Sequence, residues 1–417
     1  MENYIRLRTL VLLRKENNML LNISPLKKYP DFRLLFIGQN ISFIGNMISY
    51  VAVPYQVYEL TKSNFLIGAL GLVQLFFIVI FGLIGGTFAD RLNRRKVMLT
   101  SEIIMIIATL CLLINSLLAK PSIIAIFVLV AIFQSVFGFH SPSMNAIIQK
   151  IIPTKDFPAV SALNSLSRSI SAIAGPALGG LLISIFSFKA AYLFDLLSFF
   201  ISFSCLYLMS NVEHERPEKK SVLHDLLLGF RFALSKPELM GTYLIDIVAM
   251  LFAFPVALFP AMSEQWGGAK SVGVLYAAMA IGGAFISLFS GWTSKIKFHG
   301  RAVVIAASLW ALFIFGLGFT HSLFYAVFFL IMAGAADMIS GIFRQIIWNN
   351  TIPNTMRGRL SGIEMISYTS GPLLGNARAG WVAASTSVTV SLWSGGLMCF
   401  ICVILTAYFL PKFWRYK

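Results

Sequence analysis

The sequence Gly86-Thr87-Phe88-Ala89-Asp90-Arg91-Leu92-Asn93-Arg94-Arg95 lies at the junction of two apolar runs, residues 66–89 and 97–118. Each run is long enough to cross the roughly 30 Å hydrocarbon core of a bilayer as a helix. A short junction that carries an aspartate and three arginines is typical of a loop at a membrane surface. This stretch therefore predicts two consecutive membrane helices, and the rest of the chain extends the pattern.

The composition excludes a soluble protein. Of the 417 residues, 58% are hydrophobic and 12% are charged, whereas soluble domains have about 25% charged residues. A hydropathy window of about 19 residues finds twelve apolar segments. We therefore predict an all-α polytopic membrane protein with twelve transmembrane helices. The segments are residues 34–57, 66–89, 97–118, 122–149, 158–186, 190–210, 240–261, 273–293, 302–320, 323–347, 360–384 and 388–410.

The distribution of lysine and arginine predicts the orientation. Most of these residues lie at the two termini and in the loops on the same side of the membrane as the termini. The opposite loops carry only Lys62, Lys120, Lys189 and Lys270. Because basic loops stay in the cytoplasm, both termini are expected to be cytoplasmic. This topology explains the net charge of +16 without a nucleic-acid partner.

A repeated pattern divides the chain into two halves of six helices. Gly175-Pro176-Ala177-Leu178-Gly179-Gly180 in the fifth segment returns as Gly371-Pro372-Leu373-Leu374-Gly375 in the eleventh. Duplicated halves are typical of secondary transporters. The first 18 residues look like an extension that precedes Met19. The expected organisation is a cytoplasmic N-terminal extension over 1–33, a first half over 34–210, a linker with an amphipathic helix on the inner membrane surface over 211–239, a second half over 240–410 and a cytoplasmic tail over 411–417.

The opening stretch resembles motif A of the major facilitator superfamily, which joins helices 2 and 3. The resemblance implies the major facilitator fold and a gating role for the matching residues. A glycine permits close helix approach, and the charged residues pair across the contact between the halves. The matching residues are Gly86, Asp90, Arg91, Arg94 and Arg95.

The glycine–proline pattern of the fifth segment resembles motif C of exporters in the same superfamily. Proline bends the helix and glycine permits tight packing. This resemblance implies that Gly179 lies where the helix contacts the other half of the protein. The residues assigned to motif C, its repeat and the interface are Arg168, Gly175, Pro176, Gly179, Gly180, Gly371, Pro372 and Gly375.

Two further stretches, Gly334–Met338 and Arg357–Ser361, resemble the branch of the superfamily that contains enterobactin-type siderophore exporters and macrolide-efflux proteins. The resemblance covers residues 25–410. It implies a proton-coupled exporter in the bacterial cytoplasmic (inner) membrane that functions as a monomer. Its partners would be a small-molecule cargo and membrane lipid.

Ionisable residues inside membrane segments are costly and usually functional. Glu364, near the inner surface, is predicted to pair with the motif A arginines and to close the inner side. Glu102 is interpreted as a structural partner of the same arginines. His140, in the fourth segment, is either a residue that titrates near neutral pH or a packing histidine.

Three charged residues of the second half are predicted to form the coupling site. The depths of Asp246 and Arg344 in neighbouring cavity helices predict an ion pair between them. Asp337, about two turns from Arg344 on the same helix, is left without an adjacent cation and is therefore predicted to exchange a proton. The alternative is that Asp337 bonds to nearby backbone or to Ser340 and only shapes the helix.

The leading hypothesis is a secondary active transporter that exports a siderophore or a hydrophobic drug by alternating access. The proton gradient supplies the energy, and we expect no cofactor, metal or catalytic residues. One alternative is an importer of a small metabolite. Another is a membrane enzyme or sensor, although the sequence offers neither a nucleophile with a base nor a cluster of metal ligands.

Overall fold

The computed structural model describes the backbone of residues 22–91, 93–210, 222–353 and 356–417, and the side chains of these residues except 83–91, 222–227, 357–359 and 361–366. Within this part of the chain the secondary structure is helical and no strand occurs. The long helices of the first half are α3 (Pro30–Thr61), α4 (Asn64–Arg91), α5 (Arg94–Leu117), α6 (Ile123–Ile151), α7 (Phe157–Phe186) and α8 (Phe188–Leu208). Those of the second half are α10 (Pro237–Ala253), α12 (Ala269–Leu288), α13 (His299–Leu317), α14 (Leu323–Thr351), α15 (Arg357–Ser385) and α16 (Val388–Phe409).

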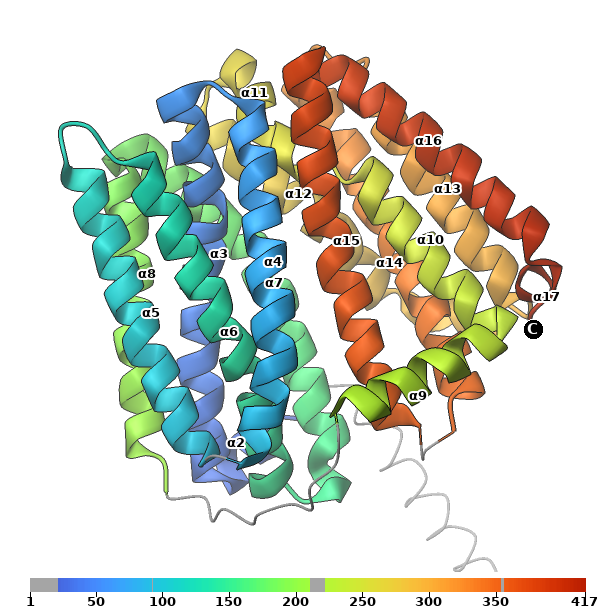
Figure 1. Cartoon of the computed structure of the whole chain (residues 1–417), viewed down its shortest axis with the longest axis horizontal. Coiled ribbons are helices and arrows are strands. Elements are labelled where there is room, and N and C mark those ends of the chain that lie inside the picture. The colour runs from blue at the N-terminus through green and yellow to red at the C-terminus, as the bar shows by residue number, and fades with distance from the viewer. Residues whose placement is uncertain (1–21, 92, 211–221, 354–355) are drawn as a thin grey trace, which may run out of the picture.

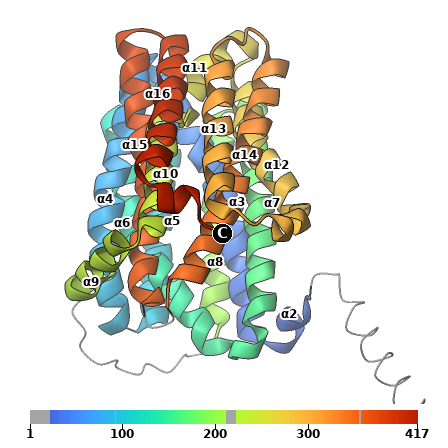
Figure 2. The same ribbon diagram turned by 90° about the vertical axis from the view of Figure 1, so that its right-hand side faces the viewer.

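The helices form two bundles that follow the two halves of the sequence (Figure 1). Within the first bundle α3 packs on α8 and α4 packs on α6, and within the second α14 packs on both α12 and α13. Figure 2 shows the long helices running in roughly the same direction, as expected for helices that cross one bilayer. The short helix α2 (Ser24–Lys28) lies at one end of the molecule and the short helix α11 (Phe259–Ser263) at the opposite end.

Eleven segments of the described residues are long and apolar enough to cross a membrane. The twelfth expected span, 360–384, corresponds to α15, which packs against α4, α10 and α16. Polar residues such as Asn376 and Arg378 lower the hydropathy of α15, and both make hydrogen bonds to neighbouring segments. The prediction of an all-α membrane protein with twelve long helices in two halves is confirmed for the described part of the chain.

The seventh span is not the continuous helix that the sequence predicts over 240–261. Helix α10 ends at Ala253, and the chain continues through a 3₁₀ turn over Val256–Leu258 into α11. Pro255 explains the break, because proline disfavours helical geometry in the residue before it and lacks an N–H group. Helix α15 satisfies the freed backbone groups: Asn376 Oδ1 accepts from Ala257 N at 3.0 Å, and Arg378 donates to Phe252 O at 3.1 Å.

Two pairs of helices join the halves where small residues let their backbones approach. Between α7 and α12, a Cβ added to Gly180 would lie 2.6 Å from Ala269 O and 2.7 Å from Gly273 Cα. Between α4 and α15, a Cβ added to Gly68 would lie 2.9 Å from Ala377 O. Gly68 and Gly273 stand at equivalent places in the two halves, so the two contacts are related by the internal repeat. Both contacts lie toward the α11 end of their helices.

The expectation that Gly179 contacts the other half is wrong. A Cβ on Gly179 would lie 3.2 Å from Ile48 O, on α3 of the same half, and Gly175 faces Met47 on that helix. In the second half, Gly371 and Gly375 face Met250 on α10 in the same way. Helix periodicity turns adjacent residues about 100° apart, so Gly180, one position on, is the residue that contacts the second half.

The two bundles meet at the α11 end and diverge toward the end marked by α2 and α9 (Figure 1). At the α11 end Lys62 Nζ lies 2.6 Å from Glu264 Oε1, and Tyr58 donates to the other oxygen of Glu264 at 3.1 Å. These contacts join the end of α3 to the segment after α11. Further inside the contact between the halves, the rings of Tyr50 and Tyr276 pack edge to face, with centroids 5.5 Å apart. We call this group of contacts the closed end.

The pKa of Lys62 is raised above its ordinary value of 10.5, first because its ammonium donates to Glu264 and then because Glu59 lies nearby. A raised pKa in the folded state means that the contribution of this pair is fully present at neutral pH. On the alkaline side it is lost as the pH rises through the pKa of Lys62 in the folded protein. The closed end therefore keeps its ion pair over the whole neutral range.

The linker contains the expected helix, α9 (Val222–Ser235), which lies across the ends of α10 and α15. Phe230 and Leu234 on α9 are exposed, as an apolar face directed at a membrane surface would be. Residues 1–21 and 211–221 lie outside the described part of the chain, and so do the side chains of Asp90, Arg91 and Glu364 and the surroundings of Gly86. The predicted pairing of Glu364 with motif A therefore stays a prediction.

The closeness of Gly180 to α12 predicts that Gly180→Leu destabilises this arrangement of the halves by about 1–3 kcal/mol, the cost of overpacking a tight contact. The measurement is thermal unfolding of the purified protein in detergent, followed by intrinsic fluorescence. Gly82→Leu is the matched control, because a Cβ on Gly82 meets no atom within 4 Å. Equal stability of the two variants would contradict the assignment of Gly180 to a backbone-to-backbone contact.

Glu264→Gln removes the ion pair at the closed end. Because exposed ion pairs contribute about 0–1 kcal/mol, the population with this end closed should fall by no more than about fivefold. The measurement is the distance between spin labels at Lys189 and Ser387, in a background without the native cysteines. Glu59→Gln removes the same charge from Lys62 within one half and should leave the distance distribution unchanged; the same shift in both variants would contradict the role of Glu264.

Candidate functional site

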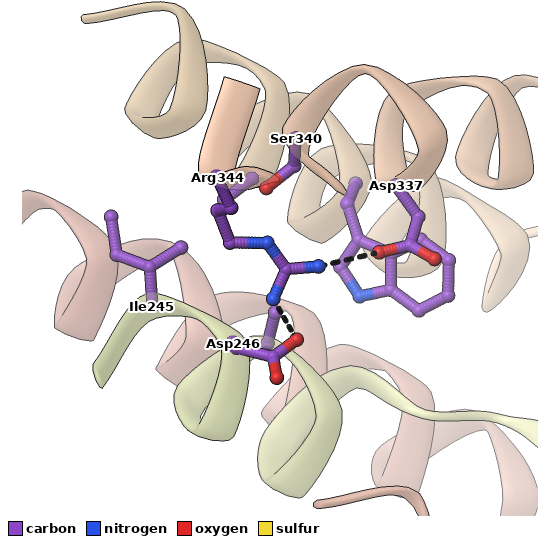
Figure 3. Close-up of a pocket in the computed structure, with 8 residues that line it drawn as sticks. Ile245, Asp246, Asp337, Ser340 and Arg344 are labelled. Atoms are coloured by element: carbon purple, nitrogen blue, oxygen red, sulfur yellow. Dashed lines mark ion pairs between the residues drawn. The ribbon is translucent and has the colours of Figure 1, made fainter. Parts of the chain in front are cut away.

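The charged site of the second half consists of Asp246 on α10 and of Asp337 and Arg344 on α14 (Figure 3). Arg344 forms an ion pair with Asp246 through Nη1, and its Nη2 lies 3.9 Å from Asp337 Oδ1. Residues seven positions apart on a helix lie two turns apart on one face. Arg344 can therefore reach back along α14 toward Asp337 and also across to α10.

The two carboxylates are held differently. The Asp246 side chain is 4% exposed, and its second oxygen accepts a hydrogen bond from Ser367 on α15 at 3.1 Å. The Asp337 side chain is 42% exposed, and its described ion pair is the longer one to Arg344. Asp246 is thus fixed in the packing of three helices, whereas Asp337 is partly exposed.

A small pocket lies at this site, with a volume of about 10 Å³. That volume is close to the minimum that holds one water molecule. Trp310 on α13 forms one wall; it is buried, and its Nε1 has no hydrogen-bond partner among the described residues. The pocket is lined by Ile245, Asp246, Ala249, Ala307, Trp310, Asp337, Ser340 and Arg344.

The charges of this site do not balance when both carboxylates are ionised. One guanidinium then faces two carboxylates in a region from which the hydrocarbon of the membrane excludes most water. Binding of one proton to either carboxylate would bring the net charge of the three side chains to zero. Asp337 is the more accessible of the two carboxylates and is held by the weaker contact, so it is the one best suited to gain and lose a proton.

The sequence predicted part of this geometry. The Asp246–Arg344 ion pair is confirmed. The expectation that Asp337 lacks an adjacent cation is wrong, because Arg344 reaches both carboxylates. Among the described residues, no hydrogen bond joins Asp337 to Ser340, which is one of the two contacts that the alternative interpretation offers. The role of Asp337 in transport stays a prediction.

His140 lies in the first half, away from this site, and is buried on α6. Its Nε2 is 3.4 Å from Oε1 of Glu102 on α5. Glu102 also accepts hydrogen bonds from Gln39 and Ser202. This contact could not be predicted from the sequence, because nothing in the spacing of Glu102 and His140 indicates that α5 and α6 bring them together.

Within motif A, Asn93 caps α5: its side chain accepts from Lys96 N at 3.2 Å. Arg95 donates to the carbonyls of Leu206 and Tyr207 at the end of α8, at 3.4 and 2.6 Å. A cation at the carboxyl end of a helix is favourable because the last carbonyls carry partial negative charge. Arg95 therefore attaches the motif A loop to the end of α8, within the first half.

The two remaining arginines inside the spans differ in their surroundings. Arg168 on α7 is exposed. Arg378 on α15 donates to Phe252 O, to Ser391 O at 2.8 Å and to Ser394 Oγ at 2.5 Å. Arg378 therefore holds the end of α10 against α15 and α16 and is structural in this arrangement.

Comparison with known sequences gives one family and a set of similar proteins. Residues 21–414 match the family described as "Transmembrane secretion effector". The chain is 26% identical over 406 residues to a protein named enterobactin exporter EntS from Shigella boydii serotype 4 (strain Sb227), with 96% of this chain and 97% of the relative covered. Identity and coverage are the same for the protein of that name from Escherichia coli O81 (strain ED1a).

Solved transporters share the fold. A bacterial homolog of the human lysosomal transporter Spinster, described as inward-facing and unoccupied, aligns with a TM-score of 0.68 at 15% identity, covering 95% of this chain and 100% of that one. A peptide transporter, POT, in complex with sulfate aligns with a TM-score of 0.72 at 11% identity over 93% of this chain and 95% of that one. Likeness at these identities concerns the fold alone. Since the family match extends over nearly the whole chain, the protein belongs to the transmembrane secretion effector family and is a secondary transporter of the major facilitator superfamily.

Proposed function

We propose that the protein exports a siderophore-class molecule from the cytoplasm and that protons moving inward drive the export through Asp337. The observation that carries the proposal is the sharing of Arg344 between buried Asp246 and partly exposed Asp337. A cation shared between two acids is released from one of them when that acid binds a proton. Protonation of Asp337 would therefore change the net charge of the pocket that α10, α13 and α14 line.

The orientation follows from the basic loops. If the basic side is cytoplasmic, the closed end with Lys62 and Glu264 is the outer one, and the structure represents a state open to the cytoplasm. In this state cargo would enter from the cytoplasm and Asp337 would lose its proton inward. In the opposite state cargo would leave and Asp337 would bind a proton from outside. Both termini would be cytoplasmic in the inner membrane, and the monomer would be the working unit.

The choice of cargo rests on the relatives. Proteins that match 96% of this chain are named enterobactin exporters, and the chain covers nearly their full length. This supports a siderophore as the cargo and export as the direction. A hydrophobic drug and an imported metabolite are the competing cargoes, and transport measurements with a defined orientation of the protein distinguish them.

The test uses proteoliposomes that contain the full chain, with enterobactin as the probe cargo and an imposed pH gradient. The wild type is expected to move enterobactin against the proton flow, and no such movement would contradict siderophore export. Asp337→Asn should still bind enterobactin, because the change keeps the side-chain shape, but should lose nearly all gradient-driven transport. Full pH-gradient-driven transport by Asp337→Asn would remove Asp337 from the mechanism.

A second prediction separates the two carboxylates by stability. Asp246→Asn leaves Arg344 buried without its main partner, and breaking a buried ion pair in this way costs about 3–5 kcal/mol. Asp337→Asn makes the same chemical change at a partly exposed site and should cost about 1 kcal/mol or less. Thermal unfolding of the two purified variants measures the difference. Equal destabilisation would contradict the distinction between a structural Asp246 and an exchanging Asp337.

A further inference from the structure

A second group of buried polar side chains lies in the first half, where four helices meet. Glu102 on α5 is 1% exposed, and its Oε1 accepts from Gln39 of α3 at 2.9 Å and from Ser202 of α8 at 2.7 Å. His140 of α6 brings its Nε2 to 3.4 Å from the same oxygen. Gln39 also donates to Ser202 at 3.0 Å. We call these four residues the Glu102 cluster.

The hydrogen bonds within the Glu102 cluster leave one oxygen of the carboxylate without a partner among the described residues. Three groups converge on Oε1 of Glu102, whereas Oε2 is buried and has no hydrogen-bond partner among the described residues. The His140 contact has the distance of an ion pair but not the alignment of a hydrogen bond. Buried carboxylates normally have both oxygens satisfied, because an unsatisfied charged oxygen loses its hydration without compensation. A proton shared by Glu102 and His140 neutralises the buried charge and so reduces that penalty.

The described side chains that contact Glu102 bring little positive charge to it. Helix α3 contributes the uncharged Gln39, and α6 contributes His140, whose charge depends on a proton. Helix α8 contributes Ser202 and, further along, buried Asp195, whose charge repels that of Glu102. The Cβ of Cys205 lies against Gly38 of α3. On α5 itself, the guanidinium of Arg95 is two turns away, donating to the end of α8.

The Glu102 cluster is connected to motif A on two sides. Next to His140 on α6, a Cβ added to Gly138 would lie 2.7 Å from Gly82 N on α4, and the rings of Phe139 and Phe81 lie 6.0 Å apart. Helix α4 continues from Gly82 into motif A. On the other side, Arg95 attaches the motif A loop to the same helix, α8, that supplies Ser202. The helices that form the cluster therefore contact both attachments of this loop.

We infer that Glu102 and His140, held by Gln39 and Ser202, form a second proton-binding site in the first half, separate from the site at Asp337. One proton binds, no covalent bond to carbon changes, and the charge of the cluster goes from minus one to zero. The inference depends on the proposed function only in taking the proton as the coupling ion. Binding of a proton at this site then changes the charge of the first half and not that of the second half.

The test requires neither cargo nor a gradient. The purified full chain in lipid is brought from about pH 8 to pH 5, the range in which histidine titrates, and the infrared difference spectrum is recorded. A C=O stretching band from a newly protonated buried carboxyl is expected. The band should be absent in Glu102→Gln, should shift in His140→Gln, and should remain in Asp337→Asn. An unchanged band in folded Glu102→Gln overturns the inference.

Two further variants keep the test decisive. Asp195→Asn is the matched control, because Asp195 is a buried carboxylate of the same half that bonds to Ser49 and Ser198. Loss of the band in Asp195→Asn rather than in Glu102→Gln overturns the assignment. If Glu102→Gln does not fold, Ser202→Ala removes one donor to Oε1, and an unshifted band in this variant overturns the inference as well. If the wild-type band depends on Glu102 and Asp337→Asn transports normally, the proposed coupling role of Asp337 is refuted, whereas the inference about Glu102 stands.

Discussion

Charges that are buried in a membrane protein must be neutralised by neighbours on other helices, because lipid cannot solvate them. This constraint organises both halves. In the second half one guanidinium serves two carboxylates on α10 and α14, and in the first half Glu102 accepts hydrogen bonds from α3 and α8 and lies beside His140 of α6. Each group ties together helices that are distant in sequence. The packing of each bundle therefore depends on the state of its charged residues.

The two halves repeat a common architecture but use it differently. Gly175 and Gly179 pack on α3 as Gly371 and Gly375 pack on α10, so the bent helices hold equivalent places in the two bundles. The contacts between the bundles are likewise related, through Gly68 and Gly273. The charged groups break this symmetry. The site of the second half contains the cation Arg344, whereas the site of the first half contains a cation only if His140 carries a proton.

Much of the fold could be predicted from the sequence, since long apolar runs, basic loops and the repeated glycine–proline pattern depend on local composition. The Asp246–Arg344 pair was also predictable, because depth in the membrane restricts which residues can meet. The contact of Arg344 with Asp337 was missed, because a long side chain can reach two turns along its own helix. The Glu102–His140 contact was missed because it depends on how α5 and α6 rotate against each other, which no residue spacing reveals. The break in the seventh span could have been predicted, since Pro255 is visible in the sequence.

The interruption of α10 has a mechanical consequence. Glu264, which holds the closed end, and Asp246, which anchors Arg344, belong to the same span but not to one rigid rod, because the chain is non-helical at Phe254 and Pro255. Arg378 and Asn376 secure the two sides of the joint to α15 separately. If the α11 segment moves, changes in the backbone angles of Phe254 and Pro255 can absorb the movement. The end of the protein can thus rearrange while the distances within the charged site stay constant.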